Sequence, residues 1–261
     1  MVFQSSSPDI RIVDRSILRY IVPIVLISAA ALGWWWSLRM SGEMRADGMT
    51  GMSMSTQSAM SAAGFLVAWL AMMIAMMLPA MTPVVKLYAL ASEQRRVAPL
   101  PFFVGGYLAV WLLLGVPAYF AWRGLNMPMA DGADWVARLA GGTFVAAGIW
   151  QFTPLKDLCL RNCRSPMSFF LRYGGHIKRP FGAIRMGITH GLFCVGCCWA
   201  MFAVLVAVGT MNIGWMLILT ALIVTEKLFR YGERVATLAG VAFLILGVIL
   251  LVSPNTISVI S

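Results

Sequence analysis

The stretch that decides the fold is Met186-Gly-Ile-Thr-His190-Gly-Leu-Phe-Cys194-Val-Gly-Cys197-Cys198-Trp-Ala-Met201-Phe-Ala-Val-Leu-Val-Ala-Val208. It contains no charged residue, and it exceeds the ~20 residues that an α-helix needs to cross the hydrocarbon core of a bilayer. Helical geometry places one imidazole, two thiols and one thioether on a single face: His190, Cys194, Cys197 and Met201. The stretch therefore predicts a membrane-spanning helix with soft ligand groups along one side.

Metal binding is the function that we favour for this face, which Cys198 flanks. Imidazole, thiol and thioether groups together suit a thiophilic ion such as Cu(I). Core packing is the alternative, because free Cys and Met also behave as hydrophobic side chains. Polar groups that face lipid are disfavoured, so we expect the face to point into a helix bundle. Gly187, Gly191 and Gly196 would let a neighbouring helix approach closely.

The composition of the whole chain predicts an all-α, polytopic transmembrane bundle. Of the 261 residues 60% are hydrophobic and 11% are charged, and the mean hydropathy is +0.82. About seven spans are predicted: 17–38, 61–85, 102–122, 135–153, 186–208, 213–229 and 233–253. The sixth is short and ends at Glu226-Lys227, so six spans are the alternative. We expect Glu226 to pair with Lys227 or with an arginine of a loop.

The net charge of +10 does not indicate nucleic-acid binding, because the basic residues lie between the apolar spans. Most fall in alternate loops, as the positive-inside rule predicts for a cytoplasmic N-terminus. The expected organisation is a cytoplasmic segment 1–16, a single transmembrane domain 17–253 and a tail 254–261. The basic residues expected on the outside are few: Arg39, Arg45, Arg123 and Arg138.

A methionine-rich segment is expected outside the membrane, in the loop 39–60. The residues Met49, Met52 and Met54 stand among Gly, Ser and Thr without apolar periodicity, which is typical of a flexible loop. Exposed thioethers bury nothing, but they bind Cu(I) and stay uncharged in an oxidising compartment. We therefore predict that they capture the ion, with compositional drift as the alternative.

The second span carries a ribbon of methionines at helical spacing. Such stripes are usually part of a core, but thioethers can also conduct a soft metal ion. Because the ribbon follows the methionine-rich loop, we include it among the predicted metal ligands: Met72, Met73, Met76, Met77 and Met81.

A second thiol pair, Cys159 and Cys163, lies in the basic cytoplasmic loop 154–185. The i, i+4 spacing places both sulfurs on one side of a helical turn. Nearby Lys156, Arg161 and Arg164 are expected to favour thiolate over thiol. We predict an inside-facing pair that hands over Cu(I); a basic loop lying on anionic lipid is the alternative.

Several motifs resemble those of a known family. They are Ala71-Met-Met-Ile-Ala-Met-Met-Leu-Pro-Ala80, Phe152-Thr-Pro-Leu-Lys-Asp-Leu-Cys-Leu-Arg-Asn-Cys-Arg164, Gly196-Cys-Cys-Trp199, Gly209-Thr-Met-Asn212 and Glu226-Lys227. In this order they resemble the bacterial DUF2182 family of predicted metal-binding integral membrane proteins, sometimes labelled copper chaperones. The likeness extends over about 61–252. It implies metal binding in the bacterial cytoplasmic membrane and supplies no set of catalytic residues.

The function expected from these features is binding of Cu(I), or alternatively Zn(II), and its transfer across or within the membrane. No phosphate-cradling motif is visible, so transfer would be passive or driven by a copper-donating or copper-accepting protein. One rival is a thiol–disulfide or quinone-linked oxidoreductase using Cys194–Cys197 or Cys159–Cys163. Against it, a thiol at mid-membrane is expected to lack groups that stabilise a thiolate. The other rival is a non-catalytic assembly subunit of a larger copper or haem complex.

Overall fold

The computed structural model describes residues 15–49, 61–93, 100–130, 134–173, 179–209 and 212–253. Over these ranges the chain is helical and contains no strand, which confirms the all-α prediction. The helices are α1 (Arg15–Met49), α3 (Ala62–Glu93), α4 (Leu100–Ala130), α5 (Asp134–Gln151), α6 (Pro154–Arg164), α7 (Pro166–Tyr173), α8 (Pro180–Val208), α9 (Ile213–Leu228) and α10 (Gly232–Val252).

Five of these helices, α1, α3, α4, α8 and α10, are long and apolar enough to cross a membrane. The other two predicted spans, 135–153 and 213–229, are also helical, as α5 and α9, but they do not meet that description. Helix α5 carries Asp134 and Arg138 in its first turns. Helix α9 has only 16 residues, fewer than the ~20 that a crossing needs.

Two predicted loops contain helix. Helix α1 continues through Met49, so the first half of the loop 39–60 is helical; Arg, Met, Glu and Ala favour helix there even without apolar neighbours. The basic loop 154–185 contains α6 and α7. Both are amphipathic and begin with a proline, which suits the first helical position because its missing N–H would be unpaired there anyway.

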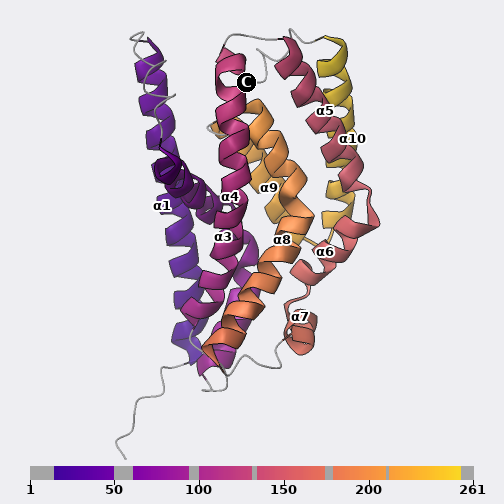
Figure 1. Cartoon of the computed structure of the whole chain (residues 1–261). Coiled ribbons are helices and arrows are strands. Elements are labelled where there is room, and N and C mark those ends of the chain that lie inside the picture. Colours follow the sequence, from indigo (N-terminus) through magenta and orange to yellow (C-terminus); the bar gives the residue numbers. More distant parts are fainter. Residues whose placement is uncertain are drawn as a thin grey trace, which may run out of the picture.

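Helices α3 and α8 form the inner part of the bundle. Of the apolar windows in these two helices, 61% and 67% of the residues are buried, against 28%, 33% and 33% for α1, α4 and α10. Figure 1 shows α1 on one flank, the antiparallel pair α5 and α10 on the other, and α8 running obliquely between them. Most residues of α8 are therefore covered by protein, although a minority, such as Leu192 and Trp199, are exposed.

Close backbone contact joins α8 to α4, as the glycines of α8 predict. A Cβ atom at Gly187 would collide with the carbonyl oxygen of Phe103, and one at Gly106 with that of Ile184. At Gly191 an added Cβ would come within 3.0 Å of the side chain of Val110, which is a tight contact. Since neither helix tolerates a side chain at these positions, the two backbones pack directly against each other.

Helix α6 is fixed at both ends. The hydroxyl of Thr153 accepts a hydrogen bond from the backbone N–H of Lys156 at 3.3 Å and so caps its start. At the other end, the guanidinium of Arg164 donates to the carbonyl oxygen of Phe229 at 2.8 Å. These contacts hold α6 beside α8 and the end of α9 (Figure 1).

Candidate metal centre

The ligand face of α8 points into the bundle, as expected. The side chains of His190, Cys194, Cys197 and Met201 are all 2% exposed or less, and Cys198 is equally buried. Enclosure by α3, α4, α6 and α9 removes these groups from both lipid and water. Burial is expected both for a packed core and for a metal site. The atoms in contact with each sulfur are therefore needed to tell the two apart.

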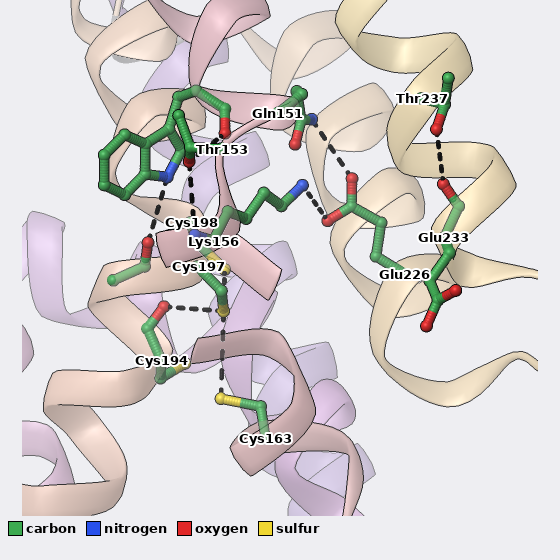
Figure 2. A network of polar contacts seen from close by, with 12 residues as sticks. Gln151, Thr153, Lys156, Cys163, Cys194, Cys197, Cys198, Glu226, Glu233 and Thr237 are labelled. Carbon is green, nitrogen blue, oxygen red and sulfur yellow. Dashed lines mark hydrogen bonds and ion pairs between the residues drawn. The ribbon is translucent and has the colours of Figure 1, made fainter. Parts of the chain in front are cut away.

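Cys163 of α6 joins the cysteines of α8. Its Sγ lies 3.9 Å from the Sγ of Cys197, and Cys197 Sγ lies 3.3 Å from Cys198 Sγ. Figure 2 shows Cys163 reaching toward Cys197 from the neighbouring helix. All of these thiols are free. We call Cys163, Cys194, Cys197 and Cys198 the thiol cluster.

Three other helices each place one polar or soft group on Cys194. The Sδ of Met77 in α3 lies 3.9 Å from its Sγ. The hydroxyl of Tyr107 in α4 lies 3.1 Å from it. The ammonium group of Lys227 in α9 donates a hydrogen bond to it at 2.9 Å. Cys194 is therefore the point at which the helices around the thiol cluster meet.

Gly196 permits α6 to lie this close to α8. A Cβ atom at this position would come within 2.6 Å of the Sγ of Cys159, so the sulfur occupies the space of the missing side chain. The indole N–H of Trp150 donates to the carbonyl oxygen of Gly196 at 3.2 Å. A small residue on α8 thus brings Cys163, one turn beyond Cys159, into the thiol cluster.

The two cysteines of α6 do not form a separate inside-facing pair, which corrects the sequence interpretation. Cys163 is buried in the thiol cluster, whereas Cys159 is half-buried against Gly196. Burial raises the pKa of the Cys159 thiol above its ordinary value, so the expected preference for thiolate is wrong for this residue. Lys156 does not stabilise a thiolate at Cys159, because its ammonium group is paired with the carboxylate of Glu226.

That engagement is a buried ion pair between Lys156 and Glu226, with Nζ and Oε2 2.8 Å apart. The amide of Gln151 donates to the other carboxylate oxygen at 3.3 Å, and Figure 2 shows both groups converging on Glu226. The expectation that Glu226 pairs with Lys227 or an arginine is therefore wrong. Adjacent residues on a helix point in different directions, so Glu226 and Lys227 meet different partners.

His190 stands one turn before Cys194 within a group of aromatic rings. Its ring centroid lies 5.0 Å from that of Phe169, 5.8 Å from that of Tyr107 and 6.1 Å from that of Phe103. Its Nδ1 is buried and has no hydrogen-bond partner. This free nitrogen leaves the imidazole available as a ligand, and within the described residues no hydrogen bond joins it to a sulfur.

The methionine ribbon of α3 is buried throughout, at Met72, Met73, Met76, Met77 and Met81. Among the contacts of the described side chains, only that of Met77 joins the ribbon to a thiol. Met201 is likewise buried. The side chains of Met49, Met52 and Met54 lie outside the described residues.

Sequence reasoning missed Lys227 and Tyr107 as neighbours of the thiol cluster. The position of Lys227 in an apolar segment indicates that it needs a partner. The adjacent Glu226 suggested itself as that partner, whereas the structure shows Cys194. For Tyr107 the sequence carries no signal, because an aromatic residue in an apolar span is ordinary.

The sulfur separations suit a shared soft ion. Two sulfur ligands about 2.3 Å from one ion lie roughly 3.8–4.6 Å apart. The pairs Cys163–Cys197 and Met77–Cys194, both at 3.9 Å, fall within this range. In the part of the chain that the structure describes, no three His, Cys, Asp or Glu side chains are arranged as a finished metal site. The arrangement therefore offers two pairs of sulfur atoms at this separation.

Comparison with known proteins gives one family. The model of the PpoB2 family, described as a copper chaperone, matches residues 66–250. This range is more than half of the chain, and it includes the thiol cluster together with Met77, Tyr107 and Lys227. No curated protein and no solved structure matches the chain.

Proposed function

The chain belongs to the PpoB2 copper chaperone family, and on that premise we propose that it binds Cu(I) inside a membrane and delivers it to an accepting protein. The observation that carries this proposal is the convergence of cysteines from α6 and α8 with Met77 from α3. Thiolate and thioether sulfurs are the ligands that favour Cu(I) over harder ions. Zn(II) is the competing cargo, because thiolates bind it as well.

The thiol cluster is the proposed holding site. Cys194 with Met77, and Cys163 with Cys197, are sulfur pairs of suitable separation. His190 and Met201 are the proposed ligands at the next turns of α8, on either side of the cluster. An ion could exchange between such sites without release into water, since neighbouring soft ligands lie along one buried face.

We assign the protein to the bacterial cytoplasmic membrane with its N-terminus in the cytoplasm. The support is the charge distribution, in which most basic residues fall in alternate loops. In this orientation α6 and α7 lie on the cytoplasmic side, and Met49, Met52 and Met54 outside. The direction proposed for copper is inward, from the external methionines through the ribbon Met72–Met81 to the thiol cluster.

The test is a metal count on the full chain, purified in detergent without oxygen and loaded with Cu(I). We expect the triple variant Cys194→Ser, Cys197→Ser, Cys198→Ser to lose bound copper, and Cys159→Ser to keep it. Cys159 is the matched control because it is a cysteine of the same region that packs on Gly196 instead of joining the cluster. Equal copper in the triple variant and the wild type would exclude the thiol cluster as the site.

A thiol–disulfide oxidoreductase is the second candidate function. The contacts Cys197–Cys198 and Cys163–Cys197 favour it, and so does Lys227, because an ammonium group beside a sulfur favours the thiolate form. The sequence argument that such groups are lacking at this depth is therefore wrong. A reversible two-electron couple in metal-free protein, lost in Cys197→Ser, would support this function in place of copper delivery.

A further inference from the structure

Lys227 is a buried cation whose partner is a sulfur atom. It is 7% exposed, and its ammonium group donates to the Sγ of Cys194 at 2.9 Å. Within the described residues it forms no salt bridge with a carboxylate. A charge in such surroundings is strongly disfavoured unless an opposite charge compensates it.

The other buried charges nearby cancel each other. Lys156 and Glu226 form a pair 2.8 Å apart with both side chains inaccessible to solvent. Lys227 therefore leaves one positive charge beside the thiol cluster. The group that its ammonium contacts is the thiol of Cys194, and a thiolate there would supply the compensating charge.

We propose that Lys227 is the fixed counter-ion of the metal centre and that it sets the centre to hold one monovalent soft cation between two thiolates. Two thiolates and Cu(I) carry a net charge of −1, which the ammonium group neutralises. One thiolate with Cu(I), or two thiolates with a divalent ion, would leave the buried site with a net charge of +1. Three thiolates with a divalent ion would also be neutralised, but among the described residues no three His, Cys, Asp or Glu side chains are placed to hold an ion. The thioether of Met77 can act as a further ligand without changing this balance.

This inference rests on the proposed function and assigns Lys227 a positioning role through Cys194. The ammonium group does not bind the ion, because it has no lone pair to donate. It stabilises the metal-bound sulfur by charge and by the hydrogen bond, and the thiol protons leave to water when the ion binds. Cys194 is thereby proposed as one of the two thiolates. The second comes from a cysteine beside it in the cluster, Cys163, Cys197 or Cys198, so the two sulfur pairs belong to one site.

The experiment measures the affinity of the full chain for Cu(I) and, separately, for Zn(II), each by competition with a coloured chelator in detergent without oxygen. Lys227→Met is expected to weaken Cu(I) binding by about 10- to 100-fold, the range for groups that support metal ligands, and not to weaken Zn(II) binding. Lys227→Arg, which keeps the charge, is expected to restore Cu(I) binding. Lys227→Gln serves as a second neutral variant if Lys227→Met fails to fold, as judged by circular dichroism.

The matched control is the double variant Lys156→Met, Glu226→Gln, which removes a buried ion pair nearby but keeps Lys227. Its affinity for Cu(I) should fall less than that of Lys227→Met, because it can act on the centre only through the docking of α6. The inference is overturned if a folded neutral variant of Lys227 keeps the wild-type affinity for Cu(I), or if its affinities for Cu(I) and Zn(II) fall equally. A wild-type protein that binds no copper would instead overturn the proposed function.

Discussion

Two buried lysines stand within the same part of the molecule, and their partners differ. Lys156 meets the carboxylate of Glu226, whereas Lys227 meets the sulfur of Cys194. The first pair is complete in the protein itself, since a carboxylate is ionised under ordinary conditions. The second pair is an ion pair only when Cys194 gives up its proton. Lys156–Glu226 is therefore a structural ion pair, whereas the charge of Lys227–Cys194 depends on whether the thiol is protonated.

The largest expected effect comes from breaking the first pair. Lys156→Met leaves a buried carboxylate without its cation, and removal of one partner from a buried ion pair typically costs 3–5 kcal/mol of stability. We expect a correspondingly large fall in the midpoint of thermal unfolding in detergent, followed by circular dichroism. The double variant Lys156→Met, Glu226→Gln should recover much of the loss, and a midpoint equal to the wild type in the single variant would contradict this account.

The next effect concerns copper and distinguishes the two cysteines of α6. Cys163→Ser should weaken Cu(I) binding by more than about 10-fold, since even groups outside the ligand set change metal affinity by that factor. Cys159→Ser should leave the affinity unchanged because its sulfur packs on Gly196. Chelator competition on the two purified variants measures the difference; equal affinities would remove Cys163 from the centre.

A smaller effect is expected from breaking the second lysine pair in metal-free protein. Lys227→Met leaves a thiol that keeps its proton at neutral pH at no cost, because the ordinary pKa of cysteine is about 8.5. An unpaired Glu226 can become neutral only by taking up a proton well above its ordinary pKa of about 4.3, and this costs free energy at neutral pH. We expect Lys227→Met to lower stability by about 1 kcal/mol or less, the size of a typical hydrogen bond. The thermal unfolding midpoints of Lys227→Met and Lys156→Met measure which variant loses more stability. A larger fall of the midpoint in Lys227→Met would contradict this prediction.

The smallest effect is kinetic and concerns Cys159, which no lysine contacts in the described structure. Because burial raises the pKa of this thiol, less of it is thiolate at a given pH than in free cysteine, and alkylation should be slower. The rate should continue to rise at a pH where the rate of free cysteine has levelled off. Peptide mass spectrometry after timed alkylation follows this residue alone. If the alkylation rate of Cys159 reaches half of its maximum at the same pH as that of free cysteine, or at a lower pH, the prediction is contradicted.

The sequence predicted the long apolar helices, but not α6 and α7 or the way in which the helices meet. Apolar runs and helical spacing predicted the inward face of α8, because this pattern is local. The contact between Cys163 and Cys197 depends on α6 lying over Gly196, and no local pattern expresses that docking. The partner of Lys227 was missed for a related reason, because sequence adjacency to Glu226 says nothing about direction.

Cys163 is the member of the thiol cluster that α8 does not carry, and this has a thermodynamic consequence. An ion that bridges Cys163 and Cys197 also joins α6 to α8. Docking of α6 and binding of the ion are then linked equilibria, and each strengthens the other by the same factor. A protein that pulls α6 outward by its exposed residues Leu155 and Leu158 would loosen the ion without touching any sulfur, which is how an acceptor could take copper from a buried site.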